Sequence, residues 1–417
     1  MSNKITPSIT SQKRTYIFVL SILAFTGFEF FYRASFLLIP VILYALIFFL
    51  REKISFGFNF MIVLIFSILS LLQILFGFNQ NILLFFLTFI FFFGYLLFSN
   101  IVKFEFADIY DNLIFIISLI SLFFFFITYN EKLLDFFINN VAIYFSPLYL
   151  DSNVDNLSSS YVSTNILIYN FKNFAFSYNR NSGPFWEPGM FAVFLNIAFF
   201  FNLIKFKKLF SFKNIIYILT IITTFSTTGY LGMLFIFISY NIFYSTSKLR
   251  LLYILILLFS SFYLLELDFM QSKIESQILS ANIDGASRFG AILIHLQIIT
   301  DYPFIGVGEG ISQYMIKYTD AESTPNGISL VFVKYGIPIG IFYYVLLLKS
   351  CKNIVRHLAP KPNKYLGYCL FMLFLILAFS QDITIRHFYL FMIFWGLSFS
   401  LDYNRYNYKN QKIINYA

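Results

Sequence analysis

Long apolar runs alternate with short polar turns along most of this chain, in the pattern of a protein that crosses a membrane many times. A spanning helix needs about 20 mostly apolar residues. Twelve runs fit this pattern, although several are short, and they are centred near residues 22, 43, 67, 90, 120, 196, 219, 237, 257, 338, 372 and 395. The sequence therefore predicts an all-α fold, a polytopic membrane helical bundle of about 12 spans, with residues 1–417 forming a single integral membrane domain.

Two long segments interrupt this rhythm, at residues 130–184 and 266–325. Loops of this length in a compact protein are usually functional or disordered. Both segments carry too many aromatic and aliphatic residues for plain disorder. The parity of the spans places both on the same side, so we expect two long outward-facing loops.

The lysines and arginines indicate an orientation, because cytoplasmic loops retain positive charge. With both termini in the cytoplasm, 20 of the 29 basic residues fall inside. Positive loops beside anionic lipid headgroups also explain the net charge of +9 without a nucleic-acid partner. The expected location is a membrane, with both termini on its cytoplasmic side.

Composition agrees with this class of protein. The chain is 59% hydrophobic and 12% charged, which is more apolar surface than a soluble core can bury. The run from Tyr16 is expected to remain as a first span, because aromatic residues rather than a small-residue cleavage site follow it. With Cys351 and Cys369 as the two cysteines, we expect no disulfide framework, no metal site and no cofactor.

The clearest candidate site is the segment Arg180-Asn-Ser-Gly-Pro-Phe-Trp-Glu-Pro-Gly189. It packs two opposite charges, two prolines and two glycines directly before an apolar run. If that run is a span, Arg180, Trp186 and Glu187 lie at a membrane surface in a rigid turn. Such a position suits an enzyme that acts on a lipid-linked substrate.

A second candidate lies in the long segment 266–325, where Ser287 to Thr300 has the pattern of a helix with Ser287 as a possible N-cap. Arg288 and His295 are seven residues apart and share one face. The helix is too polar to span and fits one lying at the headgroups, where both side chains could reach a lipid diphosphate. The alternatives are an arginine touching phospholipid and a packed histidine. The predicted apolar side consists of Ala291, Ile292, Leu296 and Ile299.

A glycine-rich stretch, Asp301-Tyr-Pro-Phe-Ile-Gly-Val-Gly-Glu-Gly310, follows this helix. A dinucleotide-binding loop is rejected because no strand precedes the glycines and no suitably spaced helix follows. We expect a turn that re-enters the membrane region, shaped by Pro303, Gly306 and Gly308, with Asp301 capping or pairing locally.

Together with Thr224-Phe-Ser-Thr-Thr-Gly-Tyr-Leu231 and Ser287-Arg288, these segments give the chain a family resemblance over roughly residues 170 to 345. It resembles bacterial O-antigen polymerases, in the superfamily of O-antigen polymerases and ligases. One departure is Thr324-Pro325-Asn326-Gly327, which keeps the asparagine and has Pro325 where many relatives carry a histidine. A histidine-dependent step at that position is therefore in doubt.

The resemblance implies a membrane glycosyltransferase that polymerises surface polysaccharide, joining undecaprenyl-diphosphate-linked oligosaccharides at the outer face of the bacterial inner membrane. The two long loops would then be periplasmic. Arginine suits the diphosphate leaving group because its fork of donors matches phosphate oxygens. We expect Arg180, Arg288 and Glu187 to be catalytic, with Glu187 accepting the hydroxyl proton or else pairing with Arg180. The expected substrate-binding residues are Arg386, His295, Trp186, Asn326 and Asp301, and His295 and His387 are the other candidate bases.

The expected partners are these lipid-linked oligosaccharides, membrane lipids and a chain-length regulator protein. An O-antigen ligase or related glycan transferase is an alternative. A transporter of lipid-linked sugars is a further one, but such proteins place charge and broken helices at mid-membrane. The span interiors of this sequence are almost free of charge.

Overall fold

The computed structural model describes residues 9–31, 34–52, 57–78, 81–145, 165–171, 179–244, 288–318, 325–359 and 363–399. It is about 80% helical, which confirms the predicted all-α class. The bundle helices are α1 (Ile9–Gly27), α2 (Leu38–Glu52), α3 (Gly57–Leu75), α4 (Leu83–Ile101), α5 (Phe106–Ile127), α7 (Pro188–Phe206), α8 (Phe212–Thr223), α9 (Thr227–Phe243), α14 (Gly327–Leu358), α15 (Leu366–Ala378) and the final helix His387–Phe399.

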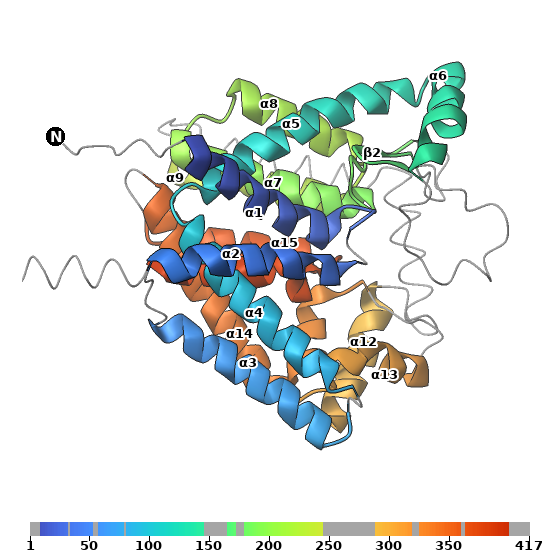
Figure 1. Ribbon diagram of the computed structural model, residues 1–417. Coiled ribbons are helices and arrows are strands. Elements are labelled where there is room, and N and C mark those ends of the chain that lie inside the picture. Colours follow the sequence, from blue (N-terminus) through green and yellow to red (C-terminus); the bar gives the residue numbers. More distant parts are fainter. Residues whose placement is uncertain are drawn as a thin grey trace, which may run out of the picture.

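Smaller elements join and cover these helices (Figure 1). They are η1 (Ser35–Leu37), α6 (Glu131–Phe136), η2 (Phe137–Val141), η3 (Ala142–Tyr144), the antiparallel strands β1 (Asn165–Ile166) and β2 (Tyr169–Asn170), α12 (Arg288–Asp301), η6 (Gly308–Gly310), α13 (Ile311–Tyr318) and η7 (Asp382–Ile385).

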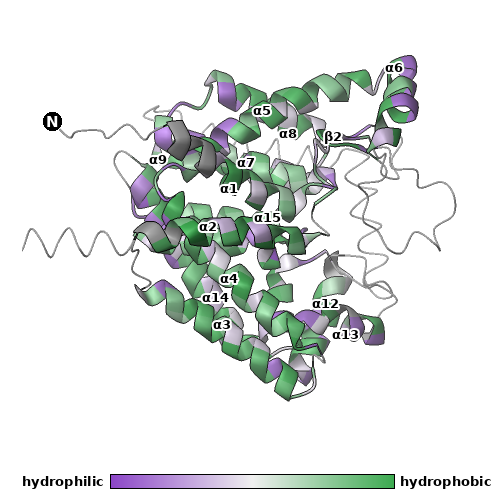
Figure 2. Ribbon diagram, viewed as in Figure 1, coloured by the Kyte–Doolittle hydropathy of each residue, from purple (hydrophilic) through white to green (hydrophobic). Residues whose placement is uncertain are grey.

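Five of the described helices are long and apolar enough to cross a membrane, namely α3, α4, α5, α7 and α14. Figure 2 shows hydrophobic residues running along α3, α4 and α5, whereas α6 carries several hydrophilic positions. The apolar parts of the other bundle helices are shorter, at 10–17 residues. The multi-span character is therefore supported by length and composition, and the count of about 12 stays a prediction. The predicted span near residue 257 lies outside the described residues.

Helix α7 is the centre of the bundle. Of its most apolar window, 83% is buried, compared with 44% for α5. It packs against α5, α8 and α9, and its ring of phenylalanines includes Phe191 and Phe194, both fully buried. A helix that is apolar on all sides belongs in a core, as its sequence requires. Its first residue, Pro188, directly follows Glu187.

The described parts of the two long segments, α6, β1, β2, α12 and α13, lie at one end of the bundle (Figure 1). We call this the loop end. The opposite end, where α1 begins, is the lysine end, defined by Lys103, Lys205, Lys207, Lys208 and Lys213.

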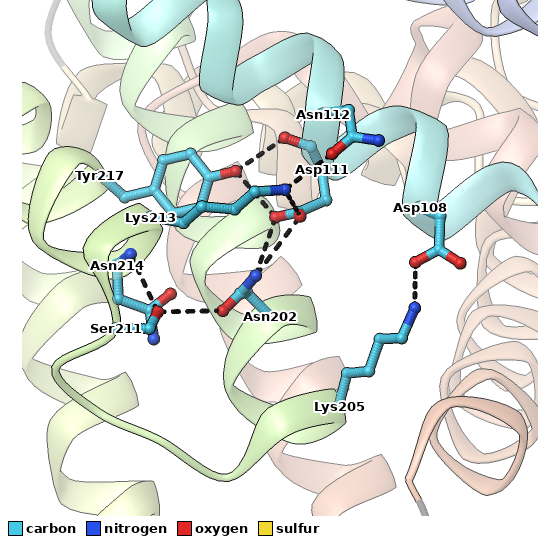
Figure 3. A network of polar contacts seen from close by, with 9 residues as sticks. All are labelled: Asp108, Asp111, Asn112, Asn202, Lys205, Ser211, Lys213, Asn214 and Tyr217. Carbon is cyan, nitrogen blue, oxygen red and sulfur yellow. Dashed lines mark hydrogen bonds and ion pairs between the residues drawn. The ribbon is translucent and has the colours of Figure 1, made fainter.

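A polar network fastens the lysine end (Figure 3). The carboxylate of Asp111 on α5 accepts hydrogen bonds from Lys213 Nζ at 2.6 Å, from the Tyr217 hydroxyl at 2.8 Å and from Asn202 Nδ2 at 3.3 Å. Asp111 is buried, and its charge is therefore matched by donors from α7 and α8. The network joins α5, α7 and α8 and therefore stabilises their packing at this end of the bundle.

Candidate functional site

A cavity of about 560 Å³ lies at the loop end, between α1, α4, α14 and the turn before the final helix. Its titratable lining residues are Tyr95, Glu309, Lys334, Asp382, Arg386 and His387. We call this group the ionic pocket. The apolar wall of the cavity comes mainly from α4, through Leu84, Leu87 and Phe91.

Lys334 enters the pocket from α14 and is 7% exposed. Its Nζ lies 2.7 Å from Oε1 of Glu309, which stands in the short η6 helix. A buried ammonium needs such a partner, because an unpaired charge in an apolar interior is very unfavourable. The pair holds η6 against α14.

The backbone of α14 is broken close to Lys334. Gly336 has φ +74° and ψ 171°, and Pro338 lacks a backbone N–H. The glycine-rich turn after α12 docks at this break: Ile337 N donates to Pro303 O at 2.7 Å, and Val307 N donates to Val333 O at 2.9 Å. Backbone groups released by the break thus find partners.

Gln73 of α3 links the glycine-rich turn to the broken part of α14. Its Nε2 donates to Lys334 O at 2.8 Å and to Ile305 O at 2.6 Å. Gly306 has φ +64°, and a Cβ there would lie 2.5 Å from Val333 O. The glycine is therefore required both by the backbone conformation and by the close approach of α14.

Arg386 reaches the pocket from the turn between α15 and the final helix, residues 381–387. Its Nη2 donates to Oδ2 of Asp382 at 2.5 Å. Thr384 fixes this turn to the start of α14, because its hydroxyl donates to Gly327 O at 2.6 Å and its own carbonyl accepts from the Tyr343 hydroxyl at 2.6 Å. The guanidinium is thereby held at the cavity wall.

His387, the next residue, is buried and also lines the cavity. Its Nδ1 lies 2.6 Å from the Tyr95 hydroxyl of α4. The edge of the Phe91 ring packs against the imidazole with ring centroids 5.2 Å apart. The ionic pocket therefore combines two cations, two carboxylates and an imidazole beside an apolar wall. Chemically, it can hold an anionic headgroup attached to an apolar chain.

The Arg180–Gly189 segment is a rigid turn, as its composition indicates. Glu29 N donates to Pro184 O, and Trp186 N donates to Gly27 O, each at 3.0 Å. These bonds fasten the segment to the end of α1. None of Arg180, Trp186 and Glu187 is among the lining residues of the ionic pocket.

Arg180 stabilises the turn between α8 and α9 through two hydrogen bonds. Its Nε donates to Thr224 O and its Nη2 donates to Phe225 O, each at 3.1 Å. Phe225 has φ +46°, an unfavourable conformation for a phenylalanine that the guanidinium helps to hold. These contacts give Arg180 a structural role, and its catalytic role stays a prediction.

Glu187 is the N-cap residue of α7, with Pro188 in the first turn. Gly189 lies between Glu187 and Gln381, since a Cβ at Gly189 would be 3.3 Å from Glu187 Oε1 and 2.6 Å from Gln381 Nε2. The segment therefore borders the 381–387 turn that carries Arg386. This is the link between the predicted motif and the ionic pocket.

The helix expected at Ser287–Thr300 is found as α12. Its described buried positions are Gly290, Ala291, His295 and Ile298, and the last three recur at helical spacing. Leu296, expected on the same side as Ala291, is 51% exposed, because five residues of a helix turn the chain well away from the starting face. That part of the prediction was wrong.

His295 and Asn326 join α12 to α14. His295 is fully buried, with Nδ1 2.6 Å from Ser329 Oγ. Asn326 caps α14 by accepting from Ser329 N at 3.0 Å and from Ser329 Oγ at 2.9 Å. Burial lowers the pKa of His295 to about 4, so it is neutral at pH 7. Neither residue lines the ionic pocket.

Arg288 is the first residue of α12, and its side chain lies outside the described part of the chain. Asp301 is the last residue of the same helix and is exposed. The structure thus brings the predicted site residue Arg386 and the candidate base His387 into the pocket. The predicted site residues outside its lining are His295, Asn326, Asp301, Trp186, Glu187 and Arg180.

Sequence reasoning missed Lys334, Glu309, Asp382 and Tyr95 as members of one site. A signal was present in Lys334, a charge inside an apolar run two residues before Gly336-Ile-Pro338. Within the described ranges, no three His, Cys, Asp or Glu side chains group as metal ligands would. In comparisons with family models, curated proteins and solved structures, nothing matches this chain.

Proposed function

We propose that this protein is an O-antigen polymerase, a membrane glycosyltransferase that joins undecaprenyl-diphosphate-linked repeat units at the outer face of a bacterial inner membrane. In this proposal the loop end faces outward and both termini are cytoplasmic. The observation that carries it is the ionic pocket, where Lys334 and Arg386 stand beside the apolar wall of α4 at the loop end.

The pocket suits a lipid diphosphate by its two kinds of surface. Arg386 offers a planar fork of donors to phosphate oxygens, and Lys334 adds a compact positive charge. Leu84, Leu87 and Phe91 line the same cavity and offer an apolar surface to the first isoprene units of the carrier. A diphosphate bound here would neutralise part of the positive charge of Arg386 and Lys334, which Asp382 and Glu309 neutralise in its absence.

The reaction needs the leaving diphosphate to be stabilised as the glycosidic bond breaks. A fixed donor aimed at developing charge typically lowers the barrier by about 3 to 4 kcal/mol. We assign this task to Arg386, assisted by Lys334. The Arg180–Gly189 segment supports it indirectly, because Gly189 packs on Gln381 at the start of the 381–387 turn.

The test is the surface polysaccharide of a strain that lacks this protein, complemented with wild type, Arg386→Ala or Lys334→Met at matched abundance. Only wild type should convert a single repeat unit on the lipid core into a ladder. Arg356→Ala and Lys349→Met are matched controls, because both residues are exposed on α14 towards the lysine end, and they should restore the full ladder. An unchanged ladder in the strain without the protein would contradict the proposal.

A transporter of lipid-linked sugars is the second candidate, favoured by the break in α14 beside the buried Lys334–Glu309 pair. The same experiment separates the two functions. Loss of even the single repeat unit would indicate transport or ligation, because a polymerase acts only after the unit has crossed the membrane. A chain-length regulator is the expected protein partner of the polymerase.

A further inference from the structure

We infer that His387, oriented by Tyr95, takes the proton from the attacking sugar hydroxyl. This inference rests on the proposed glycosyl transfer and adds the base that the reaction requires. Tyr95 is then a positioning residue, because it acts through the imidazole rather than on the substrate.

The first argument comes from the other candidate bases in the pocket. Glu309 is held by Lys334 at 2.7 Å, and Asp382 is held by Arg386 at 2.5 Å. In each pair, one carboxylate oxygen is occupied by its contact with the cation. Among the described titratable lining residues, His387 is the proton acceptor that no ion pair holds.

Candidates outside the pocket are excluded by their positions. His295 is fully buried against α14, with Nδ1 on Ser329 Oγ. Glu187 caps α7 and does not line the cavity. A general base has to come within hydrogen-bonding reach of the hydroxyl it deprotonates, about 3 Å or through one water.

The second argument is the geometry of His387 itself. Nδ1 is 2.6 Å from the Tyr95 hydroxyl, and the ring is held edge-on by Phe91 and Tyr95. Tyr95 lies twelve residues along α4 from Leu83, roughly 18 Å from the start of the helix. The other ring nitrogen, Nε2, has no hydrogen bond within the described part of the chain, so it remains available to substrate.

The proton transfer balances as a single displacement. The acceptor hydroxyl gives its proton to Nε2, and its oxygen forms a bond to the anomeric carbon of the growing glycan. The bond between that carbon and the diphosphate oxygen breaks, and its electron pair leaves with the diphosphate. The imidazolium then donates through Nδ1 to the Tyr95 oxygen, which stabilises the new charge.

Several charged or titratable groups face His387 and shape its titration. Arg386 precedes it in the turn, Lys334 approaches from α14, and Tyr95 stands on α4. Glu309 and Asp382 line the same cavity. Burial lowers the pKa of His387 to about 3, and the charges of Arg386 and Lys334 contribute to the lowering. An incoming diphosphate would favour the imidazolium, so a bound substrate strengthens the base.

The test is the pH dependence of chain extension by the purified protein in liposomes, using undecaprenyl-diphosphate-linked repeat units extracted from a strain without the protein. Wild type should lose activity on the acidic side as His387 becomes protonated. His387→Gln should be slower by about 10² to 10⁴ and lose the acidic limb. His357→Gln, which changes a histidine at the lysine end, should keep the wild-type profile.

Tyr95→Phe keeps the ring and removes the hydroxyl. Without an acceptor for Nδ1–H, the imidazolium is less stable, so the acidic limb should shift to lower pH and the maximal rate should fall by about tenfold. A purely structural role of Tyr95 would lower the rate without moving the limb. If His387→Gln does not fold, Tyr95→Phe still tests whether His387 is the base.

Two failures are distinguishable in this experiment. If wild type extends chains but both variants keep its pH profile, His387 is not the base and the polymerase proposal stands. If wild type extends nothing, the proposed function fails and the inference fails with it.

Discussion

Lys334 of α14 and Glu309 of η6 form an ion pair of 2.7 Å at the edge of the ionic pocket. The lysine side chain is 9% exposed and the glutamate 38%. Solvent at Glu309 therefore partly screens the attraction between the two charges. The buried Lys334 ammonium, in contrast, needs the carboxylate as its counter-charge. The pair also fastens the turn after α12 to the broken part of α14.

Glu309→Gln should destabilise the fold because it leaves the Lys334 ammonium buried without a counter-charge. We expect a loss of about 2 kcal/mol, below the 3 to 5 of fully buried pairs because Glu309 is partly exposed. Thermal unfolding of the two proteins in detergent measures this loss of stability. The double variant Lys334→Met/Glu309→Gln should recover most of the loss, and a single variant as stable as wild type would contradict the pairing.

Gly336→Ala should be more harmful than Gly77→Ala. Both glycines have positive φ, +74° and +77°, and alanine in the left-handed region costs about 1 to 2 kcal/mol. The backbone cost is higher at Gly336, because its ψ of 171° places it in a region that essentially only glycine adopts. A Cβ at Gly77 meets nothing within 4 Å, whereas one at Gly336 would clash with the backbone of Phe304. Gly77→Ala thus isolates the conformational cost. Equal melting temperatures for the two variants would show that the turn does not dock on α14.

Stability should fall on acidification through His295. Its pKa is about 4 in the folded protein and 6.5 when exposed, so between these values the unfolded state binds the extra proton. The free energy of unfolding is therefore unaffected by this group above pH 6.5. It decreases as the pH falls toward 4, by up to about 3 kcal/mol. Melting curves at pH 7 and pH 5 should show a smaller drop for His295→Gln than for wild type.

Arg180→Ala should lower the stability of the protein rather than only its activity. The guanidinium bonds to Thr224 O and Phe225 O would be lost, at a cost of about 3 kcal/mol for two charge-assisted bonds. Arg180→Lys should rescue little, because a single ammonium cannot reproduce the fork. A fully stable Arg180→Ala protein that makes no ladder would instead support the catalytic role predicted from the sequence.

Local features were predictable where neighbouring residues cause them. The apolar runs centred near residues 67, 90 and 196 predict helices, and these are α3, α4 and α7. Prolines and glycines in the Arg180–Gly189 segment predict a rigid turn, and Pro303 with Gly306 predicts another. The helix near residues 287–300 follows from its own periodicity.

The apolar face of α12 shows where local reasoning ends. Its leucines at 293 and 296 are about half exposed, while His295 is fully buried against α14. Hydropathy ranks these side chains in the opposite order. Only the position of Ser329 and Asn326, which supply hydrogen-bond partners, makes the buried imidazole acceptable.

The sequence by itself determined the helical class, the apolar spans and the glycine-rich turns, because these depend on residues within one or two helical turns of each other. Only the tertiary structure decided which charges share a site. Tyr95 and His387 meet across 292 residues, and Gln73 and Lys334 across 261. Such contacts arise when the helices pack, since burying a charge forces it to find a partner wherever the fold brings one near.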